Sequence, residues 1–79
     1  MEELVKYIVE NLVDNKDAIS ISTIEESEKV SVITVHVDSN DVGKIIGRNG
    51  KIASSIRTIV KSASAKSGKR FIVKIGERD

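Results

Sequence analysis

The spacing of apolar residues predicts a helix at the start of the chain. Leu4, Ile8 and Leu12 recur at steps of four, with a valine directly after each of them. This is the wide apolar stripe of an amphipathic helix, and it extends over residues 2–14. Asparagine and aspartate then interrupt the pattern, so we expect the helix to end between residues 11 and 15.

Three later segments alternate between apolar and polar positions with period two, as β-strands do. They are residues 18–24, 30–37 and 70–75, and the first two are rich in β-branched side chains. Only the short polar run 25–29 separates the first pair. Two strands joined by a short polar link are most simply an antiparallel hairpin.

Two helices are predicted between the second and third strands. Residues 38–41 form a cluster of N-cap residue types, so a short helix should follow over residues 42–46 and end at Gly47. A longer helix should begin after Gly50 and be closed by Gly68. Its expected buried face consists of Ile52, Ile56, Ile59, Val60 and Ala63.

The predicted fold class is α+β with the element order α-β-β-α-α-β. Residues 38–69 separate the second and third strands, which is enough chain for a crossover that makes these two strands parallel. We therefore expect a three-stranded mixed sheet with the helices on one face. The chain has 79 residues, which is the size of one domain (1–79).

Composition excludes several classes of protein. Hydrophobic residues make up 39% and charged residues 32%, which is typical of a globular domain and not of a disordered one. There is no cysteine, which excludes disulfides and thiolate metal sites. Glu2 and Glu3 stand where a signal peptide has basic residues, and no long apolar run follows. We expect a cytoplasmic protein that does not contact a membrane.

The charge is divided unevenly along the chain. Residues 1–40 contain nine acidic and three basic residues, whereas residues 41–70 contain eight basic residues and one acidic residue. An acidic half joined to a basic half suggests a site for a polyanion on one side of the molecule. On charge alone, two solvated charged faces are the better interpretation.

The segment with candidate chemistry is the glycine-bracketed turn at residues 47–50, Gly-Arg-Asn-Gly. Glycines allow positive φ and close approach of a partner to the backbone. Free N–H groups and the positive end of the following helix would form an anion pocket, to which Arg48 and Lys51 add charge-assisted donors. The alternative is a turn in which glycine serves conformation only, and a lone G-x-x-G does not decide between the two.

The surroundings of this turn resemble a known family. The run Val-Gly-Lys-Ile-Ile-Gly-Arg-Asn-Gly at residues 42–50 follows a predicted strand and precedes an isoleucine-lined helix, as in the KH domain of RNA-binding proteins. The resemblance covers essentially the whole chain. It implies the type II KH arrangement, since the type I arrangement needs a further strand and helix after the last strand. A chain of this size is also similar to the small bacterial single-KH-domain proteins of the KhpA type.

The resemblance implies that the G-x-x-G loop holds the backbone of about four nucleotides of single-stranded RNA. Gly43 would let the strand pass close to the short helix, and Val42, Ile45 and Ile46 would form an apolar groove floor. Alternatively these aliphatic residues are simply core, which we favour for Ile46 and Ile56. The RNA-binding residues implied are Gly43, Lys44, Ile45, Gly47, Arg48, Asn49, Gly50, Lys51 and Ser54.

Other kinds of site find little support in the sequence. Tyr7 and Phe71 are too few and too far apart for the aromatic platform of an RRM or an OB-fold. The P-loop pattern fails because Arg48 stands where it needs Gly. His36 is the only histidine and is better interpreted as a strand-face residue than as a ligand or base. We predict no catalytic residues, no metal and no cofactor.

The sequence therefore predicts a single-stranded RNA-binding protein of low specificity that performs no chemistry. By resemblance, it would act as a global RNA binder or RNA chaperone linked to cell-envelope and cell-shape control. Its partners would be a second copy of itself or a larger KH-containing RNA-binding protein. Two rivals stay open: a KH-fold module that binds protein, and a binder of single-stranded DNA. An enzyme is a remote third.

Overall fold

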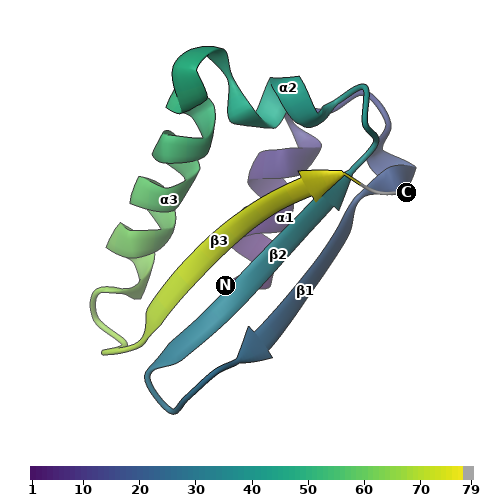
Figure 1. Ribbon diagram of the computed structural model, residues 1–79. Helices are drawn as coiled ribbons and strands as arrows, with labels where there is room; N and C mark the ends of the chain where they lie inside the picture. Colours follow the sequence, from purple (N-terminus) through teal and green to yellow (C-terminus); the bar gives the residue numbers. More distant parts are fainter. Residues whose placement is uncertain (78–79) are drawn as a thin grey trace.

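The computed structural model describes residues 1–77 and has the element order that the sequence predicts (Figure 1). The elements, in chain order, are α1 (Glu2–Glu10), the 3-10 turn η1 (Lys16–Ala18), β1 (Ser20–Glu25), β2 (Val30–Val37), α2 (Val42–Ile46), the 3-10 turn η2 (Arg48–Gly50), α3 (Lys51–Ser64) and β3 (Arg70–Glu77). The α+β class and the α-β-β-α-α-β order of the main elements are therefore confirmed.

The sheet has three strands with β2 in the middle. β1 runs antiparallel to β2, with Ile21 opposite Val35. β3 runs parallel to β2 on its other side, with Val73 opposite Ile33. A parallel pair requires a crossover connection, and α2 and α3 provide it. Both the predicted hairpin and the mixed sheet are confirmed.

The helices cover one face of this sheet, as predicted (Figure 1). Side chains from α1, β2, α3 and β3 meet there in one apolar core, to which α2 contributes a single isoleucine. The core residues are Val5, Val9, Val13, Ile33, Val35, Val37, Ile45, Ile56, Val60 and Val73. Because α2 is tied to the core in this way, the loop that follows it has a fixed starting point.

Helix α1 is shorter than the apolar stripe over residues 2–14 predicts, since it ends at Glu10, just before the expected range of 11–15. The amides of Leu12 and Val13 both donate to the Val9 carbonyl, at 3.0 and 3.1 Å, so the chain turns there. Val13 is nevertheless buried in the core. The apolar pattern continues past the helix because Val13 packs into the core from the turn that follows α1.

Helix α3 buries a narrower stripe than predicted. Its buried residues are Ala53, Ile56, Val60 and Ser64, whereas Ile59 is 45% exposed and Ala63 is also exposed. Ile59 lies about 100° around the helix from Val60, which turns it away from the sheet. The prediction that Ile59 and Ala63 are buried was wrong. No helix of residues 1–77, α3 included, is long and apolar enough to cross a membrane.

The turn between α3 and β3 also differs from the prediction. Helix α3 ends at Ser64 with Ala65 as its C-cap, so Gly68 does not close it. Ser67 donates to the Ser64 carbonyl from its hydroxyl at 2.7 Å and from its amide at 3.0 Å. Gly68, with φ +71°, lies further along this turn and leads the chain into β3.

Candidate nucleic-acid interface

The glycine-bracketed turn joins α2 to α3 at one end of the molecule, at the top of Figure 1. Its backbone takes positive φ at Gly47 (75°), Asn49 (57°) and Gly50 (73°). Asparagine is one of the few residues with a side chain that tolerates this region. The Gly47 amide donates to the Gly43 carbonyl at 2.9 Å, and the Gly50 amide donates to the Gly47 carbonyl at 3.2 Å. The predicted tight helix-to-helix turn is present.

Gly47 is needed for space as well as for conformation. A Cβ atom there would lie 2.6 Å from Cγ1 of Ile52 and 2.9 Å from its backbone nitrogen. No side chain fits at that distance, because the turn folds directly onto the first turn of α3. Gly50 faces open space, so only its positive φ favours glycine there.

The turn presents positive charge and free donors. Arg48, Asn49 and Lys51 are all exposed. The amides of Arg48 and Asn49 make no backbone hydrogen bond within residues 1–77. No carboxylate of that part of the chain pairs with Arg48 or Lys51. The 14-residue helix α3 begins directly after the turn and adds the positive end of its dipole. This arrangement can hold an anion.

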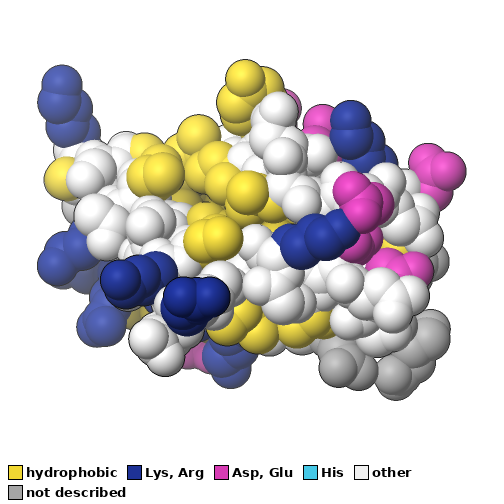
Figure 2. Space-filling view, turned by 90° about the horizontal axis from the view of Figure 1, so that it is seen from above, with side chains coloured by type: hydrophobic (Ala, Val, Ile, Leu, Met, Phe, Trp, Pro, Cys, Tyr) yellow, Lys and Arg dark blue, Asp and Glu magenta, His cyan; other side chains and the backbone are white. Residues whose placement is uncertain are grey.

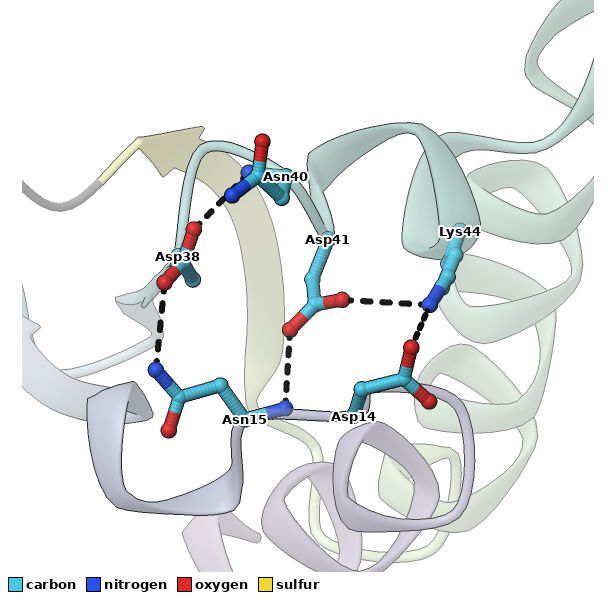
Figure 3. A network of polar contacts seen from close by, with 6 residues as sticks. All are labelled: Asp14, Asn15, Asp38, Asn40, Asp41 and Lys44. Carbon is cyan, nitrogen blue, oxygen red and sulfur yellow. Dashed lines mark hydrogen bonds and ion pairs between the residues drawn. The ribbon is translucent and has the colours of Figure 1, made fainter.

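Lys44, one turn earlier in α2, is in the opposite situation (Figure 3). Its Nζ contacts Oδ2 of Asp14 and lies 3.3 Å from Oδ1 of Asp41. The hydrogen bond to Asp14 is the main reason why the pKa of Lys44 lies above its ordinary value. The ammonium of Lys44, one of the RNA-binding residues that the resemblance implies, is therefore paired with two carboxylates of its own chain.

Asp41 connects α2 to the segment after α1. It is only 3% exposed, and its Oδ2 accepts the backbone N–H of Asn15 at 3.0 Å while Oδ1 faces Lys44 (Figure 3). The bond from Asn15 is the main reason why the pKa of Asp41 lies below its ordinary value. Asp41 precedes α2 as its N-cap residue but makes no side-chain cap bond, since its carboxylate is used here.

Asp38 adds a second link at the same place. Its Oδ2 accepts Nδ2 of Asn15 at 3.1 Å, and its Oδ1 accepts the backbone N–H of Asn40 at 2.9 Å (Figure 3). The bond from Asn40 is the main cause of the lowered pKa of Asp38. Asp38 and Asp41 together fasten the loop before α2 to the chain after α1, and this fixes where α2 and the glycine turn lie.

The remaining predicted site residues fall into two groups. Gly43 and Ser54 are exposed on α2 and α3. Ile45 is fully buried, whereas Ile46 is 37% exposed, so the prediction that Ile46 is core was wrong and the apolar surface comes from Ile46 and not from Ile45. Apart from its own helix, a Cβ at Gly43 would meet no atom of residues 1–77 within 4 Å, so close passage of a strand is not what requires glycine there, contrary to expectation.

A groove between α3 and β3 contains residues that sequence reasoning missed. Its basic rim is formed by Arg57, Lys61, Lys69 and Arg70, and Phe71 gives it apolar surface, while Val73 lines it with a side chain that is buried in the core. The basic segment 41–70 was the signal for these residues. The sequence did not show that α3 and β3 lie side by side, which is what brings Arg57 and Val73 together.

The surface seen from above, on the side of α2 and the turn, shows the uneven charge directly (Figure 2). Most basic side chains gather at the left of this view and most acidic ones at the right, with apolar surface between them. Residues 1–77 contain no group of three or more histidine and carboxylate side chains that could hold a metal. Binding of a polyanion next to apolar surface is the chemistry that this face offers.

Comparison with known proteins gives one consistent result. Residues 2–75 match the family model described as "KhpA/KhpB, KH domain". The chain is 47% identical over 75 residues to "RNA-binding protein KhpA" of Caldanaerobacter subterraneus subsp. tengcongensis, covering 95% of this chain and 99% of that protein. It is 42% identical over 73 residues to the protein of the same name from Borreliella burgdorferi, covering 92% of this chain and 88% of that protein. These relatives are named as RNA-binding proteins, not as enzymes. The chain belongs to the KhpA/KhpB KH-domain family.

Proposed function

We propose that the chain binds single-stranded RNA and that the turn Gly47–Gly50 holds its phosphates. The observation that carries this proposal is the turn's unpaired charge: Arg48 and Lys51 are exposed without a carboxylate partner in residues 1–77, beside amides that make no backbone hydrogen bond. Phosphate oxygens would accept from these donors. The names of the relatives support RNA as the ligand, and the order of elements supports the type II KH arrangement.

The strand of RNA would continue from the turn along the groove between α3 and β3. The half-buried Phe71 gives apolar surface for bases, and the basic rim on α3 faces the backbone. Ile46 exposes apolar surface near the start of this path. A few nucleotides spanning such a groove agree with the short footprint typical of KH domains.

Gly43, Lys44, Ile45 and Ser54 take different parts in this proposal. Gly43 has no close intramolecular neighbour that requires glycine, which supports close approach of a ligand to α2 at that point. Exposed Ser54 lies on α3 within a turn of Lys51 and can donate to a phosphate. Buried Ile45 and ion-paired Lys44 act indirectly, by holding α2 in place.

Self-association, or pairing with a larger KH-containing RNA-binding protein, is the second part of the proposal. Large apolar side chains are exposed at Tyr7, Ile24, Ile46 and Ile59, and these offer surface for a protein partner. A second copy would also add avidity to a short, weakly specific footprint. The wider role proposed is that of a cytoplasmic global RNA binder or RNA chaperone acting in cell-envelope and cell-shape control.

A titration with matched single-stranded RNA, single-stranded DNA and duplex oligonucleotides tests this function. If about three or four phosphates are neutralised, log K falls against log salt with a slope of about −2 to −3 for a single strand. Equal binding of DNA would favour the single-stranded DNA alternative. Salt-independent binding, or no binding of any oligonucleotide, would contradict the phosphate-binding turn and leave the protein-interaction alternative.

A further inference from the structure

Arg57, which lies outside the glycine turn, reaches across the groove to the edge of the sheet. Its Nε donates to the backbone carbonyl of Val73 at 3.3 Å, which joins the middle of α3 to β3. β3 is an edge strand, so its outer carbonyls have no neighbouring strand to satisfy them. This bond orients the planar guanidinium in the groove, since its position is fixed at Nε.

The outer end of this guanidinium is unused within the chain. Arginine has five N–H donors in a rigid fork, and the bond to Val73 uses only the one at Nε. Arg57 forms no ion pair with any carboxylate of residues 1–77, and its side chain is exposed. Its neighbours on the rim, Lys61, Lys69 and Arg70, are all basic, and of these Lys69 is paired with Glu25 at 3.0 Å. The two Nη groups are therefore available to a ligand, and they can act only as hydrogen-bond donors.

The position of Arg57 suits a base and not the phosphate held at the turn. It follows Gly50 by seven residues, which is about 10 Å along the axis of α3. It also lines the same groove as the half-buried Phe71, whose apolar surface favours the flat body of a nucleobase.

Resting on the proposed RNA binding, we propose that Arg57 determines base specificity and selects cytosine or guanine at the nucleotide that enters the groove. A fork of two parallel N–H donors needs two adjacent acceptors. Guanine offers N7 and O6, and cytosine offers N3 and O2. Adenine places its amino group beside N1 and N7, and uracil separates its two carbonyls by an N–H, so neither can accept the fork.

The experiment uses short, unstructured RNA oligonucleotides of uridine that carry one cytidine, one guanosine or one adenosine at each position in turn. Fluorescence anisotropy gives the dissociation constant of the full chain for each. We expect cytidine and guanosine at one position to bind about fivefold or more tightly than uridine and adenosine there. Equal affinity for all four bases at every position would overturn the proposal, although binding itself would still support the phosphate-binding turn.

Two variants separate base reading from simple charge. Arg57→Lys keeps the positive charge but removes the fork, so we expect the preference for cytidine and guanosine to disappear. Lys61→Gln, a matched control on the next turn of the same helix, should weaken every oligonucleotide alike and keep the preference. If Arg57→Lys weakens all oligonucleotides equally and keeps the wild-type ratio, Arg57 binds phosphate and the proposal fails. Thermal melts of both variants check that they are folded.

Discussion

Two basic residues of the same short segment, Lys44 and Arg48, lie in opposite surroundings. Lys44 contacts Asp14 and Asp41, so its charge is compensated inside the chain. Arg48 has no carboxylate partner within residues 1–77 and stands beside amides without backbone partners. Whether a lysine or arginine is available to a polyanion therefore depends on the carboxylates around it and not on the basic residue itself.

The largest expected effect comes from reversing the charge at Arg48, the arginine without a carboxylate partner in residues 1–77. Arg48→Asp together with Asn49→Asp leaves both glycines in place, so the turn can still form. Exposed substitutions of this kind change stability by only about 0.5 kcal/mol each. Two carboxylates facing a phosphate should cost several kcal/mol of binding. RNA binding should therefore be lost in an anisotropy titration, while the thermal melt still shows a cooperatively folded domain.

Lys16→Asp, an exposed charge reversal in η1, is the control for a general effect of net charge. It should reduce RNA affinity only slightly, because its new carboxylate lies in η1 and not in the turn that binds phosphate. Wild-type RNA affinity in the folded double variant would mean that the turn serves conformation only.

The next largest effect is expected at Gly47, which supports the turn from within. Its φ of 75° and ψ of 174° fall in a region that only glycine adopts readily. Gly47→Ala would also bring Cβ within 2.6 Å of Ile52. Strain and overpacking together should reduce the free energy of unfolding by about 2–4 kcal/mol, measured by urea denaturation.

Gly43→Ala is the matched control for this substitution. Its Cβ would meet open space within α2, so the free energy of unfolding should stay the same or rise by less than about 1 kcal/mol. RNA affinity should fall, because a methyl group would stand where the ligand approaches. Unchanged RNA affinity would remove Gly43 from the proposed interface.

The fold could be predicted from the sequence to a much greater extent than the site. Alternation fixed Val30–Val37 correctly at both ends because this central strand buries a regular face. Periodicity misplaced Ile59, because α1 and the sheet cover only a narrow stripe of α3. The turn Gly47–Gly50 was predicted since it depends on adjacent residues and on the φ preferences of glycine.

Contacts between distant residues account for what the sequence could not show. Lys44 and Asp14 are 30 residues apart, and only the folded chain brings them together. Arg57 and Val73 meet because a helix and an edge strand lie side by side. Ile45 and Ile46 are adjacent and chemically identical, so only the rotation of α2 decides which one is buried. Charge and motif therefore indicated the right segment but not which of its side chains are available.

The ion pairing of Lys44 can be weakened by a substitution at Asp41. Asp41→Asn keeps a side-chain acceptor for the Asn15 amide but removes the charge that faces Lys44. The melting temperature at pH 7 should fall, since a buried charge-assisted contact is lost. RNA affinity should change less than in the Arg48 variant, because loosening α2 weakens the site whereas the partly freed Lys44 charge strengthens it.

The pH dependence of this effect follows from the lowered pKa of Asp41. A carboxyl group whose pKa is lower in the folded state stabilises the fold above its unfolded pKa of about 3.9. That stabilisation is lost as the pH falls through the folded pKa. The difference in melting temperature between wild type and Asp41→Asn should therefore be constant above about pH 5 and shrink below about pH 4. A difference that does not change down to pH 2 would contradict this role of the carboxylate.

The smallest expected effect is a gain and not a loss. Asp14 is 84% exposed and is the outer of the two carboxylates that face Lys44. Asp14→Asn should leave the melting temperature nearly unchanged, because exposed ion pairs contribute little to stability. It would leave Lys44 with one carboxylate in place of two, so the ammonium becomes partly available to RNA, and the net charge rises by one. We expect RNA affinity to rise by less than about fivefold at low salt, and by less still at 0.5 M salt, where exposed charges are screened.

Glu10→Gln adds the same charge on α1 and should raise the affinity less than Asp14→Asn does. Equal gains from the two variants would mean that RNA responds to total charge alone, and that the pairing of Lys44 does not limit its contribution.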